Sequence, residues 1–260
     1  MPVVPIACLT DNYAYAVFSS GNAAAVVVDP SEAEPVIAEL ERLDLRLGGL
    51  LLTHHHWDHV GGIEGLLARY GNLPVIAHAV DAAKVPSVNR TVSDGESFEL
   101  CGIDFEAMHV PGHTLGAVAY RAMGALFTGD TLFAAGCGRL FEGTAAQMHA
   151  SLSRLAALPM DTEMYCGHEY ALLNLAFAAA IEPGNHDVRA RIERVKALRN
   201  AGRPSVPSTI GEECATNPFL RCDQPEFRQR AAVERSFTEP SRSGAALFAE
   251  IRKRRSEFRA

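Results

Sequence analysis

The residues from Thr53 to His59 read Thr-His-His-His-Trp-Asp-His and come directly after an apolar run. Side chains alternate along extended backbone, so His54 and His56 are expected to project to the same side. Asp58 and His59 can then face a second point nearby. Because so many imidazole and carboxylate groups in one short segment have no evident role in packing, the segment predicts a metal site at the end of a buried strand.

Three single residues farther along the chain complete the predicted ligand set. Each follows a glycine: His113 in Pro-Gly-His-Thr, Asp130 in Thr-Gly-Asp-Thr and His168 in Cys-Gly-His-Glu. A preceding glycine lets the backbone bring a short side chain close to a shared centre. With His54, His56, Asp58 and His59, they supply five imidazoles and two carboxylates, and His55 is expected to point away. Such ligands suit zinc, iron or manganese in a reactive site better than a closed structural site rich in cysteine.

Seven protein ligands are too many for one ion, so we expect two divalent ions, with Zn²⁺ preferred and Fe or Mn as alternatives. One set comprises His54, His56 and His113, and the other comprises Asp58, His59 and His168, which leaves Asp130 to bridge. Two divalent cations facing two carboxylates keep an excess of positive charge, so a bridging water should be held as hydroxide near neutral pH. We therefore expect Asp58 and Asp130 to act in catalysis, with the bridging hydroxide as the nucleophile.

Short apolar runs alternate with helical patterns over the first two thirds of the chain, which predicts a mixed α/β domain. Strands are expected at 23–29, 49–53, 74–78, 105–110, 117–120, 125–129 and 163–167. Helices are expected at 32–42 after an N-cap at Ser31, at 61–70, and at 145–158 after an N-cap at Thr144. Asp29, at a strand end, is a candidate to orient a ligand imidazole, with a helix-capping role as the alternative.

The last third of the chain has a different pattern, with helices separated by loops rich in Pro, Ser and Gly. These helices are expected at 170–181, 186–200 and 244–258. We place the domain boundary so that residues 1–172 form the metal-binding domain and residues 173–260 form a helical, substrate-binding domain.

Composition and charge exclude several classes of protein. The 260 residues carry 31 acidic and 24 basic side chains, a net charge of -7, which argues against a nucleic-acid binder. The longest apolar runs fall short of the roughly 20 residues that cross a membrane. The first residues lack a basic region, and the six cysteines show no CxxC spacing, so we expect a cytoplasmic protein with reduced thiols. We also expect a monomer.

The motifs carry a family likeness. The His-x-His-x-Asp-His segment, with the later Gly-His, Gly-Asp and Gly-His, resembles the metallo-β-lactamase superfamily, which implies an αββα sandwich with a dinuclear site at one edge. More narrowly, the chain resembles the glyoxalase II family of hydroxyacylglutathione hydrolases over nearly its full length, including the helical C-terminal domain. The supporting stretches are Thr53–His59, Gly136–Gly143, Tyr165–Tyr170, Asn217–Arg221 and the basic last helix. The resemblance implies the seven ligands above and the hydrolysis of S-D-lactoylglutathione to D-lactate and glutathione, a step in methylglyoxal detoxification.

The resemblance also implies how glutathione is held. The positions that bind it in the family read Arg139, Phe141, Tyr170, Arg252 and Arg255 here. The family commonly has Lys at the first of these positions and Tyr at the second. Arg139 keeps the charge, but Phe141 has no hydroxyl, so one polar contact is missing or replaced. Residues 249–260 carry five basic and two acidic side chains, or +3, which forms a cationic patch for a small anionic thioester within an acidic protein.

Three other functions compete with this interpretation. An iron persulfide dioxygenase of the same superfamily would use one metal ion, but such enzymes lack this long helical C-terminal part. A β-lactamase or lactonase would not need the basic last helix. A non-enzymatic metal-binding module would not need a His/Asp site with an open bridging position.

Overall fold

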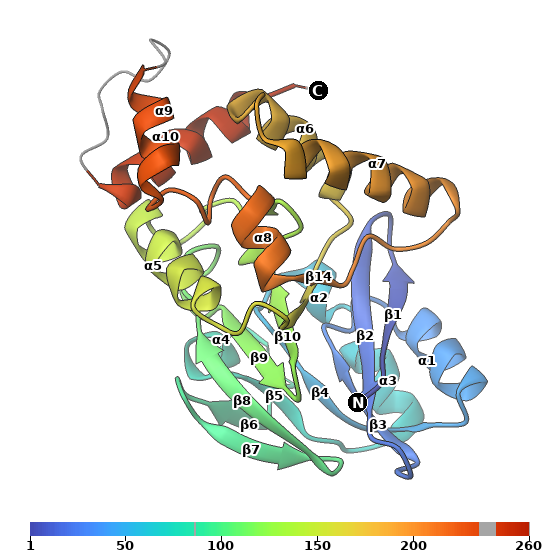
Figure 1. Cartoon of the computed structure of the whole chain (residues 1–260). Coiled ribbons are helices and arrows are strands. Elements are labelled where there is room, and N and C mark those ends of the chain that lie inside the picture. The colour runs from blue at the N-terminus through green and yellow to red at the C-terminus, as the bar shows by residue number, and fades with distance from the viewer. Residues whose placement is uncertain (86, 234–242, 260) are drawn as a thin grey trace.

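A computed structural model describes residues 1–85, 87–233 and 243–259, and within them two sheets pack face to face (Figure 1). The first sheet contains, in order, β1 (Val3–Cys8), β2 (Asn12–Phe18), β3 (Ala24–Val28), β4 (Arg46–Leu51), β5 (Val75–His78) and β6 (Arg90–Val92). The second contains, in spatial order, β14 (Ser208–Thr209), β13 (Glu163–Cys166), β10 (Ala125–Gly129), β9 (Val118–Ala122), β8 (Ile103–His109) and β7 (Ser97–Leu100). A separate hairpin joins β11 (Leu132–Phe133) to β12 (Gly136–Cys137).

Helices cover the outer faces of the sandwich and gather at one end of it. They are α1 (Ala33–Arg42), α2 (Trp57–Val60), α3 (Ile63–Tyr70), α4 (Ala79–Ala82), α5 (Ala145–Ala156), α6 (Ala171–Ile181), α7 (His186–Asn200), α8 (Ile210–Thr216), α9 (Pro225–Val233) and α10 (Gly244–Glu257). Figure 1 shows α1 and α3 beside the first sheet, and α6, α7, α9 and α10 together at the top of the view. The expected αββα sandwich with C-terminal helices is confirmed.

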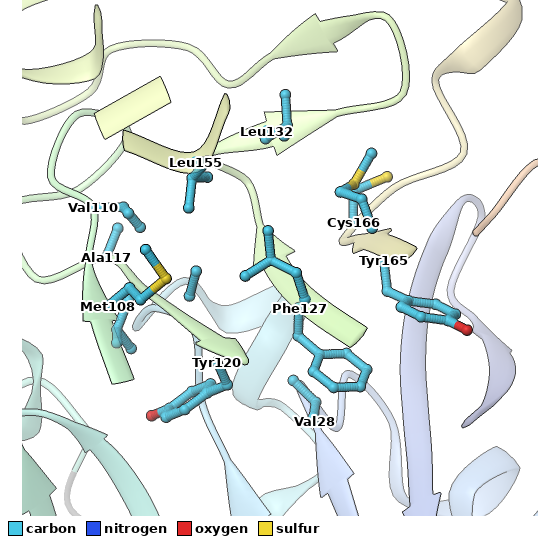
Figure 2. Packing of buried hydrophobic residues seen from close by; sticks show 14 of the residues in the cluster. Val28, Met108, Val110, Ala117, Tyr120, Phe127, Leu132, Leu155, Tyr165 and Cys166 are labelled. Atoms are coloured by element: carbon cyan, nitrogen blue, oxygen red, sulfur yellow. The ribbon is translucent and has the colours of Figure 1, made fainter. Parts of the chain in front are cut away.

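The alternation of side chains in the first sheet explains the layers. In β2, Tyr15 and Val17 belong to the core between the two sheets, whereas Ala14 and Ala16 face the core under α1 and α3. In Figure 2, Val28 of β3 lies close to Phe127 of the second sheet. The strands β2, β3, β4 and β5 therefore each contribute to two apolar cores, which fixes their register.

Helix starts followed the sequence prediction in one case and departed from it in another. Thr144 caps α5 as predicted, and its hydroxyl and the Gln147 side chain form a reciprocal capping box. The predicted N-cap at Ser31 is wrong, because α1 begins at Ala33 with Glu32 as its N-cap residue. The Glu32 carboxylate accepts a hydrogen bond from the Leu9 backbone N–H at 2.5 Å, a contact between distant segments that local sequence does not reveal.

The loops that follow four strands bring the predicted ligands together. β4 leads into the His-rich segment, β8 into His113, β10 into Asp130 and β13 into His168. In the described part of the chain, no helix has the length and apolar character needed to cross a membrane. α6 begins at Ala171, close to the domain boundary that we predicted after residue 172, which stays a prediction.

Candidate metal centre and substrate cavity

The first predicted ligand set forms a tight group of three imidazoles. His54 Nε2 lies 3.1 Å from His56 Nδ1, and His113 Nε2 lies 3.0 Å from the same His56 nitrogen. The ligand atoms of all three lie within 4.8 Å of one another. His54 and His113 are buried, and His56 is partly exposed. The expectation that His54 and His56 project to the same side is confirmed.

The second predicted set lies beside the first. The nearest atoms of Asp58, His59 and His168 also lie within 4.8 Å of one another. Asp58 Oδ2 is 3.8 Å from His59 Nε2 and 3.5 Å from His168 Nε2. Asp58 and His59 stand on the single turn of α2, so the backbone is helical where they face this second point.

Asp130 lies between the two sets. Its Oδ1 is 3.4 Å from His59 Nε2, and its Oδ2 is 3.5 Å from His113 Nε2 and 3.4 Å from His168 Nε2. One carboxylate thus faces imidazoles of both sets, which is the position expected for a bridging ligand.

Glycine at position 167 is required by this close approach. A Cβ atom there would lie 2.5 Å from Asp130 Oδ1 and 2.6 Å from His59 Cε1, closer than real Cβ contacts. Any larger residue would push the β13 loop away from the centre. The glycine before His168 therefore has the role that the sequence predicted for it.

Oxygen atoms of neighbouring groups lie against the Nδ1 atoms of the imidazoles, which are the nitrogens that face away from the centre. Asp29 Oδ2 lies 2.9 Å from His59 Nδ1, and the Asp29 carboxylate also accepts bonds from the Thr53 N–H at 2.7 Å and hydroxyl at 2.6 Å. The backbone oxygen of Arg139 lies 2.8 Å from His113 Nδ1. Asp29 thus contacts the imidazole of a predicted ligand, its orienting role stays a prediction, and the N-cap residue of α1 is Glu32.

Two residues of the first hairpin also contact the centre, and sequence reasoning missed them. Asp11 Oδ1 lies 2.9 Å from His168 Nδ1, and the Asn12 side chain donates to the Asp58 backbone oxygen at 2.9 Å. The only local signal is a polar Thr-Asp-Asn turn between two apolar runs.

The two sets differ in proton affinity. Burial lowers the pKa of His56 to about 4, and it also lowers the pKa values of His54 and His113. Burial acts in the same direction on His59, but the carboxylates of Asp130 and Asp29 raise the pKa of His59 well above its usual value. The first set is therefore neutral and ready to donate lone pairs, while the second holds protons that a cation would replace.

Two buried polar atoms without a hydrogen-bond partner indicate whether a cation fits at the centre. His59 Nε2 and Asp130 Oδ1 are buried and make no hydrogen bond with any described residue. Both point into a space where imidazole nitrogens and carboxylate oxygens converge. Buried polar atoms without partners are costly, and metal cations would satisfy them. The side chains therefore fit a metal centre of two neighbouring positions.

His55 points away from this centre. Its Nδ1 lies 2.9 Å from Asp81 Oδ2, and its Nε2 lies 3.5 Å from Glu142 Oε1. Lys84 pairs with Glu142 at 2.7 Å. This network ties the His-rich loop to α4 and to the loop after β12.

A cavity of about 870 Å³ opens onto the centre. Five of the predicted ligands line it, namely His56, Asp58, His113, Asp130 and His168. All five predicted glutathione-binding residues line it as well, namely Arg139, Phe141, Tyr170, Arg252 and Arg255. Residues predicted to bind metal and residues predicted to bind substrate, from distant parts of the chain, thus share one cavity.

The aromatic residues of the cavity contact the ligand imidazoles directly. Tyr170 stacks on His168 with ring centroids 4.7 Å apart and planes 4° apart. Phe141 is 63% exposed and approaches His56 edge-on at 5.5 Å. The two rings therefore stand beside different halves of the centre.

The two basic residues of α10 differ in their surroundings. Arg252 is buried, and its Nη1 donates to the backbone oxygen of Cys137 at 2.8 Å. Arg255 is partly exposed and donates to the Asn174 side-chain oxygen at 3.2 Å.

The αββα sandwich and its His/Asp centre define a class of protein, the metallo-beta-lactamase superfamily, whose family model matches residues 9–168. Residues 169–258 match a second model, the hydroxyacylglutathione hydrolase C-terminus. The chain belongs to the hydroxyacylglutathione hydrolase family within this superfamily.

Individual relatives agree with both matches. The hydroxyacylglutathione hydrolase of Methylococcus capsulatus is 47% identical and aligns over 100% of this chain and 99% of its own. That of Aeromonas hydrophila is 49% identical over 86% of this chain and 87% of its own. Among solved structures, that of TTHA1623 in a di-iron-bound form has a TM-score of 0.61 and 27% identity, and covers 85% of this chain and 100% of its own.

Proposed function

We propose that this protein hydrolyses the thioester of S-D-lactoylglutathione to D-lactate and glutathione, and thereby takes part in methylglyoxal degradation. The observation that carries the proposal is the shared cavity, where the converging His/Asp groups meet a wall of basic and aromatic residues. Family membership supports the same activity, because the relatives named above are hydroxyacylglutathione hydrolases.

The proposed cofactor is a pair of divalent metal ions, with Zn²⁺ preferred over Fe and Mn. His54, His56 and His113 would hold one ion, Asp58, His59 and His168 the other, and Asp130 would bridge them. When bound, such ions supply a hydroxide nucleophile at neutral pH and polarise the thioester carbonyl. Burial keeps the imidazoles of the first set neutral, whereas neighbouring carboxylates raise the pKa of His59 in the second set, and this difference supports the division.

The side chains of this protein hold the reacting groups in place. Asp29 and the Arg139 carbonyl group fix the imidazoles of His59 and His113 with their Nε2 atoms toward the centre. Asp58 and Asp130 face the space where the nucleophile would stand, which is the catalytic role proposed for them. The leaving group is a thiolate whose thiol has a pKa near 8.5, so no side chain needs to donate a proton to it.

We propose that glutathione lies along the wall formed by Arg139, Phe141, Tyr170, Arg252 and Arg255. Glutathione thioesters carry two carboxylates, and the guanidinium groups of this wall match them in charge. Phe141 and Tyr170 flank the centre, so they would contact the part of the substrate nearest the thioester.

We further propose that the protein acts as a monomer in the cytoplasm on this small molecule, without a nucleic-acid or membrane partner. The six cysteines are free thiols, which supports a reducing compartment.

Loss of thioester absorbance with S-D-lactoylglutathione tests the proposal. Metal content is measured on the same sample, and oxygen uptake is followed with glutathione persulfide. Thioester hydrolysis without oxygen uptake supports the hydrolase. Oxygen uptake with one iron per chain would indicate the dioxygenase instead, and metal binding without either reaction would indicate a non-enzymatic module. The relatives do not favour these two alternatives.

A further inference from the structure

The turn between β1 and β2 contacts two members of the second ligand set. Asp11 Oδ1 lies 2.9 Å from His168 Nδ1. The Asn12 side chain donates to both the backbone oxygen of Asp58, at 2.9 Å, and its Oδ2, at 3.2 Å. Asp11, the last residue of the turn, and Asn12, the first residue of β2, therefore contact groups that are 110 positions apart in the chain, at 58 and 168.

Backbone hydrogen bonds fasten this turn to the loop that carries His168. The backbone N–H of Glu169 donates to the backbone oxygen of Asp11 at 2.8 Å, and the backbone N–H of Tyr13 donates to the backbone oxygen of Gly167 at 2.9 Å. Asn12 and His168 form an isolated antiparallel bridge between these bonds. The position of Asp11 relative to the imidazole is thus set by backbone on both sides.

Among the described residues, the Nδ1 atoms of His113 and His54 in the first ligand set face neutral oxygen atoms and not carboxylates. His113 Nδ1 faces the Arg139 carbonyl oxygen at 2.8 Å, and His54 Nδ1 faces the Thr53 hydroxyl at 3.1 Å. In the second set, both imidazoles face carboxylates, since His59 pairs with Asp29 and His168 with Asp11. A carboxylate behind a ligand imidazole fixes its tautomer and raises its basicity, and its loss typically costs ten- to a hundredfold in metal affinity.

We propose that Asp11 and Asn12 are positioning residues for the second metal position, and that this position alone depends on them. The inference rests on the proposed dinuclear centre. Asp29 is buried in the core and also holds Thr53, whereas the Asp11 side chain is 38% exposed. Asp11 can therefore be replaced with less risk to the fold, which makes it the residue to test.

Metal titration of the metal-free, full-length protein tests this proposal without substrate. Wild-type protein is expected to take up two equivalents of Zn²⁺. In Asp11→Ala, one equivalent should bind as in wild type, and the other about ten- to a hundredfold more weakly. Asp11→Asn keeps an oxygen acceptor without the charge, so its affinity for the second equivalent should lie between those of wild type and Asp11→Ala. Cobalt absorption spectra, recorded during a parallel Co²⁺ titration, should show the second component only at higher Co²⁺ concentrations in Asp11→Ala.

Asp223→Ala is a matched control, because Asp223 pairs with His149 at 3.0 Å and neither residue lines the cavity. It should bind both equivalents as wild type does. Unchanged binding of both equivalents by Asp11→Ala would overturn the inference. So would weakening of both equivalents together with a lower melting temperature of the metal-free protein, because Asp11 would then support the fold. Wild-type protein that binds two equivalents but hydrolyses no thioester would remove the proposed function and leave this inference standing.

Discussion

Arg252 Nη1 donates a hydrogen bond to the backbone oxygen of Cys137 at 2.8 Å, which fastens α10 to β12 at the wall of the cavity. Arg252 is only 8% exposed, and its guanidinium lies 5.3 Å from the centroid of the Phe219 ring. A residue expected from the sequence to bind substrate therefore also holds the cavity together.

Arg252→Ala should affect both stability and substrate binding. The loss of a buried, charge-assisted hydrogen bond should lower the free energy of unfolding by about 2 kcal/mol. The Michaelis constant for S-D-lactoylglutathione should rise with little change in kcat, because the contact is remote from the reacting carbonyl. Denaturant titration and steady-state kinetics measure the two effects separately.

Two variants of the same helix serve as comparisons. Arg255 bonds to a neutral side-chain amide and is less buried, so Arg255→Ala should raise KM with a smaller loss of stability. Lys253 is exposed and does not line the cavity, so Lys253→Ala should change neither. An unchanged KM in Arg252→Ala would leave that residue with its structural role only.

Phe141→Tyr should strengthen substrate binding. The Phe141 ring is 63% exposed at the cavity, and a hydroxyl on it would be available to a peptide bound there. One added hydrogen bond is worth about 1 kcal/mol, or about a fivefold lower KM. Steady-state kinetics on both proteins checks this, and a KM that stays the same or rises would mean that position 141 makes no polar contact with the substrate.

Trp57 should report occupancy of the cavity by its fluorescence. It is the single tryptophan of the chain, it is 70% exposed, and it lines the cavity. A bound glutathione should remove water from the indole and change its emission. A titration with glutathione measures the effect, and Trp57→Phe should abolish the signal. Competitive inhibition by glutathione without any change in emission would place the ligand away from Trp57.

Metal uptake should release protons. In the metal-free protein, Asp130 and Asp29 raise the pKa of His59, and Asp130 and Asp11 raise that of His168, in each case against the effect of burial. At pH 7, His59 therefore carries a proton that a metal ion must displace, and binding should weaken as the pH falls. Calorimetry in buffers of different ionisation enthalpy counts the released protons. Metal uptake without proton release would mean that these imidazoles are neutral before the metal binds.

The sequence predicted which His and Asp side chains gather at the centre, because that information is local. The ligand types, the glycines before His113, Asp130 and His168, and the alternation of apolar residues in strands can all be read from neighbouring positions. The pattern at Thr144 identified the start of α5 correctly for the same reason. The hairpin of β1 and β2 was missed because Pro5 interrupts one strand and the other carries mixed polar and aromatic residues.

Only the tertiary structure decided which residues far apart in the chain contact one another. Asp11 reaches His168 across 157 positions, and Arg252 reaches Cys137 across 115. Neither pairing leaves a periodic or local signal, because it depends on which strands become neighbours and on where the last helix packs. The sequence by itself thus determined which side chains could bind metal and an anionic thioester. Only the order of strands and helices decided which groups orient them, since orientation depends on hydrogen bonds between segments that the fold brings together.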